Sequence, residues 1–120
     1  MNTLFTVAMI IEALAGIGCL FVPAAVFGPF GVTLDEIATP FVRLLGSTLI
    51  SFSVLLWLAR RSDSPEFRKG VGCSLFAYYL VSAVLLVITQ MAGLMNALGW
   101  STIGVHVALL VWFGYYIVKK

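Results

Sequence analysis

The chain has 120 residues, of which 62% are hydrophobic, and seven Lys/Arg against five Asp/Glu give it a formal net charge of +2. Charged residues make up only 10% of the chain, against about 25% in soluble domains, so a water-soluble domain of this length would lack the polar surface to cover itself. The small net charge, without a basic run interleaved with aromatic residues, argues against nucleic acid as a partner. The composition predicts one integral membrane domain over residues 1–120.

The apolar stretches predict four membrane-spanning helices. Glu12 is the only charged residue in residues 3–26, Arg43 is the only one in residues 41–59, and residues 70–118 contain no Asp, Glu, Lys or Arg. A helix rises about 1.5 Å per residue and the hydrocarbon core is about 30 Å thick, so about 20 residues cross it once. The third stretch is therefore long enough for two crossings. The predicted fold is an all-α, polytopic four-helix membrane bundle.

Turn and capping signals place the ends of the first two helices. Pro23 is expected to bend or fray the last turn of the first helix, and residues 27–31, with two Gly and one Pro, are expected to form a turn. Residues 33–36 fit a capping box and predict a short interfacial helical turn. Thr39 and Pro40 have the residue types of an N-cap and a first helical position, so the second helix is expected to begin there.

Similar signals define the last two helices. Ser64 followed by Pro65 is typical of the N-cap and first position of a helix. Gly93 has the residue type that ends helices, and Asn96 has the type that caps the start of the next one. The four predicted spans are about residues 3–26, 40–60, 65–92 and 97–118.

Basic residues are distributed unevenly between the predicted loops. Because the number of spans is even, both termini and the 60–69 loop lie on one side, and that side holds six of the seven Lys/Arg residues: Arg60, Arg61, Arg68, Lys69, Lys119 and Lys120. The other side has Asp35 and Glu36, with only Arg43 near its boundary. Basic loops are retained in the cytoplasm, so both termini are predicted to be cytoplasmic in a multi-pass protein of a bacterial-type inner (plasma) membrane.

Glu12 is the most informative polar residue, because an ionised carboxylate near the middle of a bilayer costs about 2.5–3.5 kcal/mol on insertion scales. Its helical neighbours form a face of small residues, namely Ala8, Ala15, Gly16 and Cys19. Small residues let another helix approach closely, so Glu12 is expected to face the bundle. Two roles remain open there: a protonated or hydrogen-bonded residue that specifies packing, or a ligand or proton site.

Two further residues also have alternative interpretations. Arg43 is followed on roughly the same helix face by Ser47 and Ser51, and it either snorkels to the headgroups or points inward to bind an anionic group or another helix. His106 is either a neutral histidine bonded to a nearby carbonyl or hydroxyl, or part of a polar site. A single His without a second His or a sulfur ligand at the same depth is a poor metal site, and no metal or cofactor is predicted.

The depths of the polar residues predict a site between the helices. Counted from the predicted boundaries, Glu12, Ser51 and Tyr78 or Tyr79 lie at similar depth, with Ser47 and His106 further outward. We expect Arg43, Gln90 and His106 to form the outer part of one polar cavity that descends to Glu12. The candidate ligand-binding or proton-site residues are Glu12, Arg43, Ser47, Ser51, Tyr78, Tyr79, Gln90 and His106. No P-loop, GxSxG, HExxH or CxxC motif is present, so the chain is not expected to be an enzyme.

The first half of the chain carries a series of short motifs: Pro23, Phe27-Gly28, Leu34, Arg43-Leu44-Leu45-Gly46 and Leu56-Trp57. Together they resemble small four-helix bacterial inner-membrane proteins of unknown function of the DoxX-like type, in which an Arg-x-x-Gly near the start of the second helix recurs. This resemblance implies a four-helix bundle and little chemistry. In length, number of spans and a single Glu in the first span, the chain is also similar to the small multidrug resistance transporters. It lacks their glycine- and tryptophan-rich third-helix pattern, so only Glu12 matches.

These observations predict a non-enzymatic integral membrane protein. Its expected role is to bind an apolar or lipid-like ligand, or to act as an accessory subunit for a membrane partner. The alternative is a proton-coupled exporter of small molecules that uses Glu12. The expected partners are membrane lipids, an apolar small molecule, and further copies of the chain or a larger membrane complex.

Overall fold

The computed structural model describes residues 1–119, and every regular element in that range is helical. Four helices are long and apolar enough to cross a membrane, and two short helices lie between the first and the second of them. In chain order they are α1 (Asn2–Phe21), α2 (Pro23–Phe27), the 3₁₀ helix η1 (Gly28–Phe30), α3 (Ala38–Arg61), α4 (Pro65–Met91) and α5 (Gly99–Val118). The prediction of four apolar spans is confirmed.

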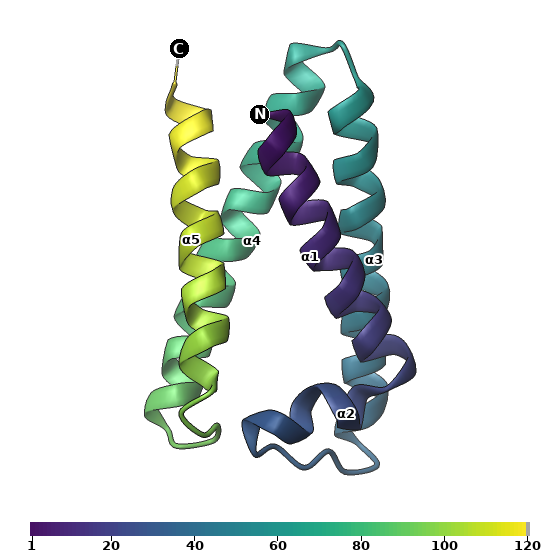
Figure 1. The fold of residues 1–120 in the computed structure, drawn as a ribbon, viewed down its shortest axis with the longest axis vertical. Coiled ribbons are helices and arrows are strands. Elements are labelled where there is room, and N and C mark those ends of the chain that lie inside the picture. Colours follow the sequence, from purple (N-terminus) through teal and green to yellow (C-terminus); the bar gives the residue numbers. More distant parts are fainter. Residues whose placement is uncertain (120) are drawn as a thin grey trace.

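The four long helices form two pairs. α1 packs along α3, and α4 packs along α5, whereas contacts between the pairs are sparse (Figure 1). The pairs meet near the end that carries both termini and the α3–α4 loop, which we call the terminal end. They diverge toward the other end, where α2 and the α4–α5 loop lie, and which we call the cover end (Figure 1). This divergence creates the space in which the candidate site lies.

The predicted small-residue face of α1 determines its packing. Ala8, Gly16 and Cys19 are all buried, and Gly16 lies against the backbone of α3 at Gly46. Small residues bring the two helix backbones close together over a long contact. Glu12 lies on the same face and is therefore turned into the bundle.

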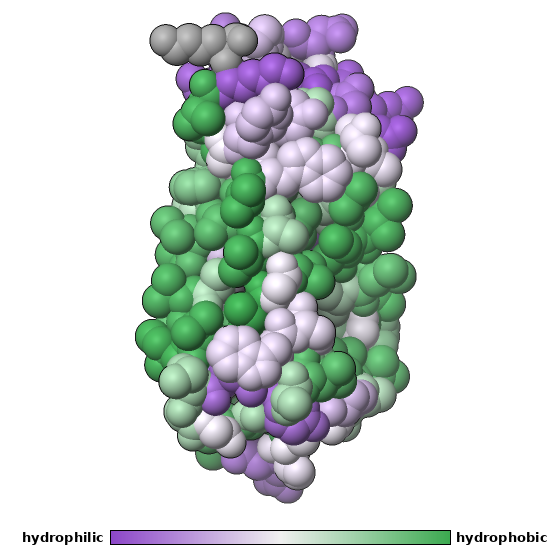
Figure 2. All heavy atoms as spheres, turned by 60° about the vertical axis from the view of Figure 1, so that its left-hand side comes forward, coloured by the Kyte–Doolittle hydropathy of each residue, from purple (hydrophilic) through white to green (hydrophobic). Residues whose placement is uncertain are grey.

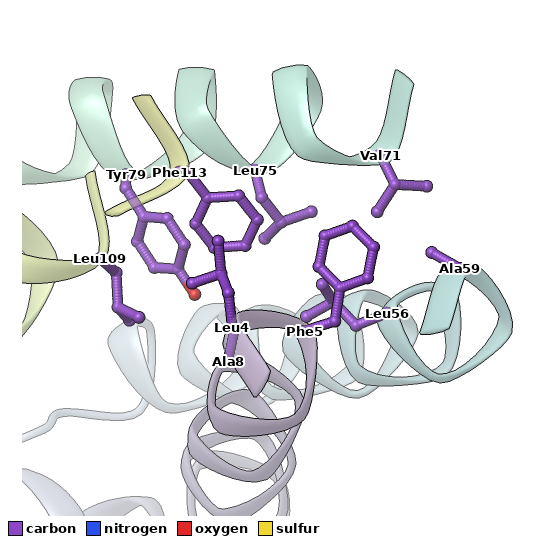
Figure 3. Close-up of a cluster of buried hydrophobic side chains, with 10 residues drawn as sticks. All are labelled: Leu4, Phe5, Ala8, Leu56, Ala59, Val71, Leu75, Tyr79, Leu109 and Phe113. Carbon is purple, nitrogen blue, oxygen red and sulfur yellow. The ribbon is translucent and has the colours of Figure 1, made fainter. Parts of the chain in front are cut away.

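A compact apolar core fills the terminal half of the bundle. It is built from buried side chains of all four long helices (Figure 3): Leu4, Phe5, Ala8, Leu56, Ala59, Val71, Leu75, Tyr79, Leu109 and Phe113. Phe5 and Phe113 stack with their ring centroids 6.2 Å apart and link α1 to α5. Dense packing of large side chains thus holds the two helix pairs together at the terminal end, whereas the other half is more open.

The outer surface suits a bilayer. Large aliphatic and aromatic side chains are exposed along all four long helices. In the space-filling view, a broad apolar band separates hydrophilic residues at both ends of the molecule (Figure 2). The longest dimension of the Cα trace is 44 Å, which matches the ~40–45 Å thickness of a bilayer with its headgroup regions.

Two predicted boundaries in the first half are corrected. α1 ends at Phe21 rather than Val26, because Val22 leaves helical geometry (φ −136°, ψ 55°) ahead of Pro23. A proline disfavours the helical conformation in the residue before it, so the chain breaks instead of bending. The segment from Pro23 onward forms separate short helices across the cover end.

The start of the second span also differs from the prediction. α3 begins at Ala38, and its first amides are capped by Asp35, whose Oδ1 accepts hydrogen bonds from Ile37 N (3.0 Å) and Ala38 N (2.7 Å). Thr39 is therefore not the N-cap. Residues 33–36 form no helical turn of their own, and Asp35, a middle residue of the proposed capping box, caps α3 directly.

Two of the three signals in the second half agree with the structure. Ser64 caps α4 by accepting a hydrogen bond from Phe67 N at 3.2 Å, and α4 ends at Met91. Gly93 takes a positive φ of 74°, as expected for a glycine that follows a helix. Asn96 is not the N-cap of the last helix: α5 begins at Gly99, Leu98 takes the N-cap position without a side-chain cap, and Asn96 Oδ1 accepts a bond from Leu98 N at 3.0 Å.

Candidate ligand-binding cavity

A cavity of about 480 Å³ lies between the two helix pairs in the cover half of the bundle. Aliphatic side chains of the four long helices form most of its wall, and Val26, Phe27 and Phe30 contribute from α2 and η1. Polar groups are few. They come from α1, α4 and α5, and they are Glu12, Tyr78, Ser82, Thr102 and His106.

Glu12 lies at the deep end of this cavity, next to the apolar core. Its side chain is only 3% exposed, and its Oε1 accepts a 2.5 Å hydrogen bond from the hydroxyl of Tyr79, which is 1% exposed. The bond joins α1 to α4 and so connects the two helix pairs. Figure 3 shows the Tyr79 ring within the apolar core, with its hydroxyl oxygen at the edge of the cluster.

Aromatic rings pack around Tyr79, the hydrogen-bond partner of this carboxyl group. His106 meets Tyr79 edge-on, with ring centroids 5.8 Å apart, and Tyr78 lies 6.2 Å from His106 and 4.9 Å from Phe52. Nδ1 of His106 is 2.8 Å from the carbonyl oxygen of Thr102, one turn earlier in α5. Glu12, Tyr78, Tyr79 and His106 therefore form one polar cluster, embedded in apolar surroundings.

Residues 23–30 comprise α2 and η1, and we call them the cover segment; three of them line the cavity at its cover end. Asn96 attaches this segment to the other helix pair through two bonds: its backbone N donates to Phe30 O, and its Nδ2 donates to Pro29 O, both at 2.9 Å. The α4–α5 loop thus holds the cover segment in place across the space between the pairs.

A family model described as a domain of unknown function, DUF8292, matches residues 6–119, which is nearly the whole chain. The chain belongs to the DUF8292 family. No curated protein and no solved structure matches it significantly. Membership in DUF8292 assigns no activity, so function has to be argued from the cavity itself.

The structure of this DUF8292 chain brings together half of the predicted site residues. Glu12, Tyr78, Tyr79 and His106 are in contact or line the same cavity. Arg43, Ser47 and Ser51 are exposed on the outer face of α3, and both serine hydroxyls donate to carbonyls of their own helix, at Leu44 O and Ser47 O.

The hypothesis that Arg43, Gln90 and His106 share one polar cavity is therefore wrong. Arg43 is exposed on the outside of the bundle, and Gln90 lies in the last turn of α4, where its Nε2 donates to Asn96 O of the α4–α5 loop at 3.0 Å. Residue depth was predicted from the sequence, but the rotation of α3 was not. The buried positions of α3 are instead Gly46, Leu49, Leu56 and Ala59.

Two features of the DUF8292 site had no counterpart among the predicted site residues. Ser82 and Thr102 line the cavity, and both lie one turn from predicted residues, Tyr78 and His106, so helical spacing could have identified them. The link from Asn96 to the cover segment joins residues far apart in the chain, and no local pattern indicates it. Within residues 1–119, no group of three His, Cys, Asp or Glu side chains is placed to hold a metal ion.

Proposed function

We propose that the protein is a non-enzymatic multi-pass membrane protein that binds an apolar or lipid-like ligand in the cavity between its helix pairs. The observation that carries this proposal is the cavity of about 480 Å³, mainly apolar in its lining, with a small polar cluster at its deep end. Sites for small ligands in proteins typically have volumes of about 300–1,000 Å³ and this combination of apolar walls and few polar groups.

The cavity borders the surface that would face lipid. Leu45, Leu85 and Val105 line it and are also 40%, 57% and 42% exposed on the outside of the bundle. Such side chains form thin walls between the cavity and the bilayer. An apolar ligand could therefore reach the cavity sideways from the membrane, without passing through water.

The charge distribution supports an inner (plasma) membrane location with the terminal end in the cytoplasm. That end holds the basic residues Arg60, Arg61, Arg68, Lys69 and Lys119, and basic residues favour the cytoplasmic side. Burial, and then the positive charges of Arg68 and Lys119, lower the pKa of the Met1 amine below its usual value. The cavity would then lie in the outer half of the bilayer.

The alternative is a proton-coupled exporter with Glu12 as the proton carrier. A carrier must connect its site to both sides of the membrane, whereas the apolar core fills the space between Glu12 and the terminal end. This arrangement favours binding over export. A role as accessory subunit to a membrane partner is compatible with the fold, but no specific feature of the structure supports it. The same holds for the resemblance to DoxX-like proteins.

Native mass spectrometry of the protein purified in mild detergent tests the proposal. We expect a co-purified apolar or amphiphilic molecule, and we expect it to be lost in Ala15→Phe and Ser82→Phe, which place a ring inside the cavity from α1 and from α4. Ala108→Phe, on the exposed face of α5, is the matched control and should retain the ligand. The binding role is overturned if all three variants retain the bound molecule equally.

A liposome assay tests the alternative. The exporter predicts a proton flux under an imposed pH gradient that disappears in Glu12→Gln, while the ligand-binding role predicts no protein-dependent flux in either protein.

A further inference from the structure

We propose that the polar cluster selects ligands whose head group donates hydrogen bonds, such as a hydroxyl or an amine, and rejects ligands with an anionic head. This inference rests on the ligand-binding function proposed above. It adds the chemistry of the head group, which neither the cavity volume nor its apolar wall determines.

As a carboxylate, Glu12 supplies the first acceptor. Its Oε1 already accepts from the Tyr79 hydroxyl, and no residue among 1–119 bonds to its Oε2. The only enclosed and unpartnered side-chain oxygen or nitrogen in that range is Gln90 Oε1, so Oε2 of Glu12 is not enclosed by protein atoms. Glu12 lines the cavity and its Oε1 is bonded to Tyr79, so Oε2 is the oxygen left for a ligand.

His106 supplies the second acceptor. Its Nδ1 lies 2.8 Å from Thr102 O, and a carbonyl oxygen can only accept, so Nδ1 carries the proton of this bond. In the neutral ring, Nε2 then has a free lone pair. This nitrogen also has no partner among the described residues and is not enclosed. With Glu12 as a carboxylate, its Oε2 and Nε2 of His106 are thus both acceptors toward a ligand. A protonated Glu12 would instead donate from Oε2, and tight binding of an anionic head group would reveal it.

The other polar groups of the cavity do not offset this preference for ligands that donate hydrogen bonds. Ser82, Thr102 and Tyr78 carry hydroxyls, which can donate or accept and therefore discriminate little. No lysine or arginine lines the cavity, and Arg43 lies on the outer face of α3. A carboxylate or phosphate head would face the Glu12 carboxyl group without a cation, whereas a hydroxyl or amine would donate to Oε2, to Nε2 or to both.

Three probes with the same dodecyl chain test the inference on the unmodified protein in detergent: dodecanol, dodecylamine and dodecanoate. Their affinities are measured by titration with native mass spectrometry. We expect dodecanol and dodecylamine to bind, and dodecanoate to bind at least about tenfold more weakly, because apposed like charges are strongly unfavourable. The ratio of dodecylamine to dodecanol distinguishes a cationic from a neutral donor.

The outcomes separate the two proposals. If dodecanoate binds as tightly as dodecanol, the head-group inference is overturned while ligand binding stands. If none of the three probes binds, the proposed function itself fails.

A variant assigns the selectivity to Glu12. Glu12→Gln keeps an oxygen for the Tyr79 hydroxyl and adds an N–H that can donate to a carboxylate. We expect its ratio of dodecanoate to dodecanol affinity to rise about tenfold. Glu66→Gln, an exposed glutamate at the start of α4, is the matched control and should leave the ratio unchanged. An unchanged ratio in Glu12→Gln would refute the role assigned to its carboxyl group.

His106→Phe provides an independent measurement if Glu12→Gln does not fold. It keeps an aromatic ring but removes the Nε2 acceptor, so dodecanol should bind several-fold more weakly while dodecanoate is unaffected. Equal loss of both probes would mean that His106 only shapes the cavity, and would contradict its role as an acceptor.

Discussion

Gly16 of α1 and Gly46 of α3 pack backbone against backbone where the two helices meet. A Cβ atom added at Gly46 would lie 2.7 Å from the Gly16 carbonyl oxygen and 2.7 Å from Leu20 N, and one added at Gly16 would lie 2.9 Å from the Gly46 carbonyl oxygen. This contact fixes the rotation of α1, and the rotation of α1 determines that Glu12, one turn earlier, points into the cavity.

Substitution of Gly46 by alanine should therefore destabilise the bundle. The added methyl group meets backbone atoms, which cannot move aside without separating the helices, and overpacking of this kind typically costs about 1–3 kcal/mol. Gly104→Ala on α5 is the control, because an added Cβ there meets no atom within 4 Å, and it should be neutral or slightly stabilising. Unfolding midpoints in mixed micelles measure both effects. Equal midpoints for the two variants would show that the close contact does not limit stability.

The bond between Glu12 and Tyr79 should contribute measurably to stability. Tyr79→Phe leaves the buried carboxyl group without its donor, and Glu12→Leu leaves the buried hydroxyl without its acceptor, so each should destabilise the protein by about 1–3 kcal/mol. Glu12→Gln should be close to wild type, because its amide oxygen still accepts from Tyr79.

A double-mutant cycle isolates this interaction. The double variant Glu12→Leu/Tyr79→Phe should be less destabilised than the sum of the single variants, with a coupling of about 0.5–2 kcal/mol. Strict additivity would mean that the two side chains do not interact in the folded protein.

The sequence was sufficient to predict the spans and the inward position of Glu12. Long apolar runs have no other stable placement, and the small residues around Glu12 mark the face on which another helix packs. The Ser64 cap and the Gly93 turn were also predictable, because each depends on a conformation that few residue types support.

The placement of Arg43, Ser47 and Ser51 could not be derived in the same way. Depth in the membrane follows from counting residues, but helix rotation depends on which neighbouring helix packs most closely. On α3 that contact is made at Gly46, and it turns the Arg43 face outward. The cover segment was missed for a related reason, since the bond from Asn96 to Pro29 joins two loops that are distant in the sequence.

The orientation in the membrane can be measured by cysteine labelling. In a background with Cys19 and Cys73 replaced, single cysteines at Thr33 and at Ser62 report the cover end and the terminal end, respectively. The excess of basic residues at the terminal end predicts that an impermeant thiol reagent added to intact cells labels position 33 and not position 62. Labelling of both positions would indicate dual insertion and would strengthen the exporter alternative.

The last prediction concerns how the cavity is closed. Asn96→Asp keeps the Oδ1 that accepts from Leu98 N but removes the Nδ2 that donates to Pro29 O, and it places a carboxylate oxygen near that carbonyl. Stability should fall by about 1 kcal/mol, and amide hydrogen exchange should become faster across the cover segment, while the rest of the bundle is unaffected.

Asn2→Asp is the matched control for this experiment. The same change at the terminal end keeps the oxygen that accepts from Arg68 Nη2 at 2.6 Å, so exchange in residues 23–30 should stay as in the wild type. If the cover segment controls access to the cavity, a bound amphiphile should also dissociate faster from Asn96→Asp than from Asn2→Asp. Faster exchange in the cover segment without faster dissociation would mean that the ligand leaves sideways, past the thin wall at Leu45, Leu85 and Val105.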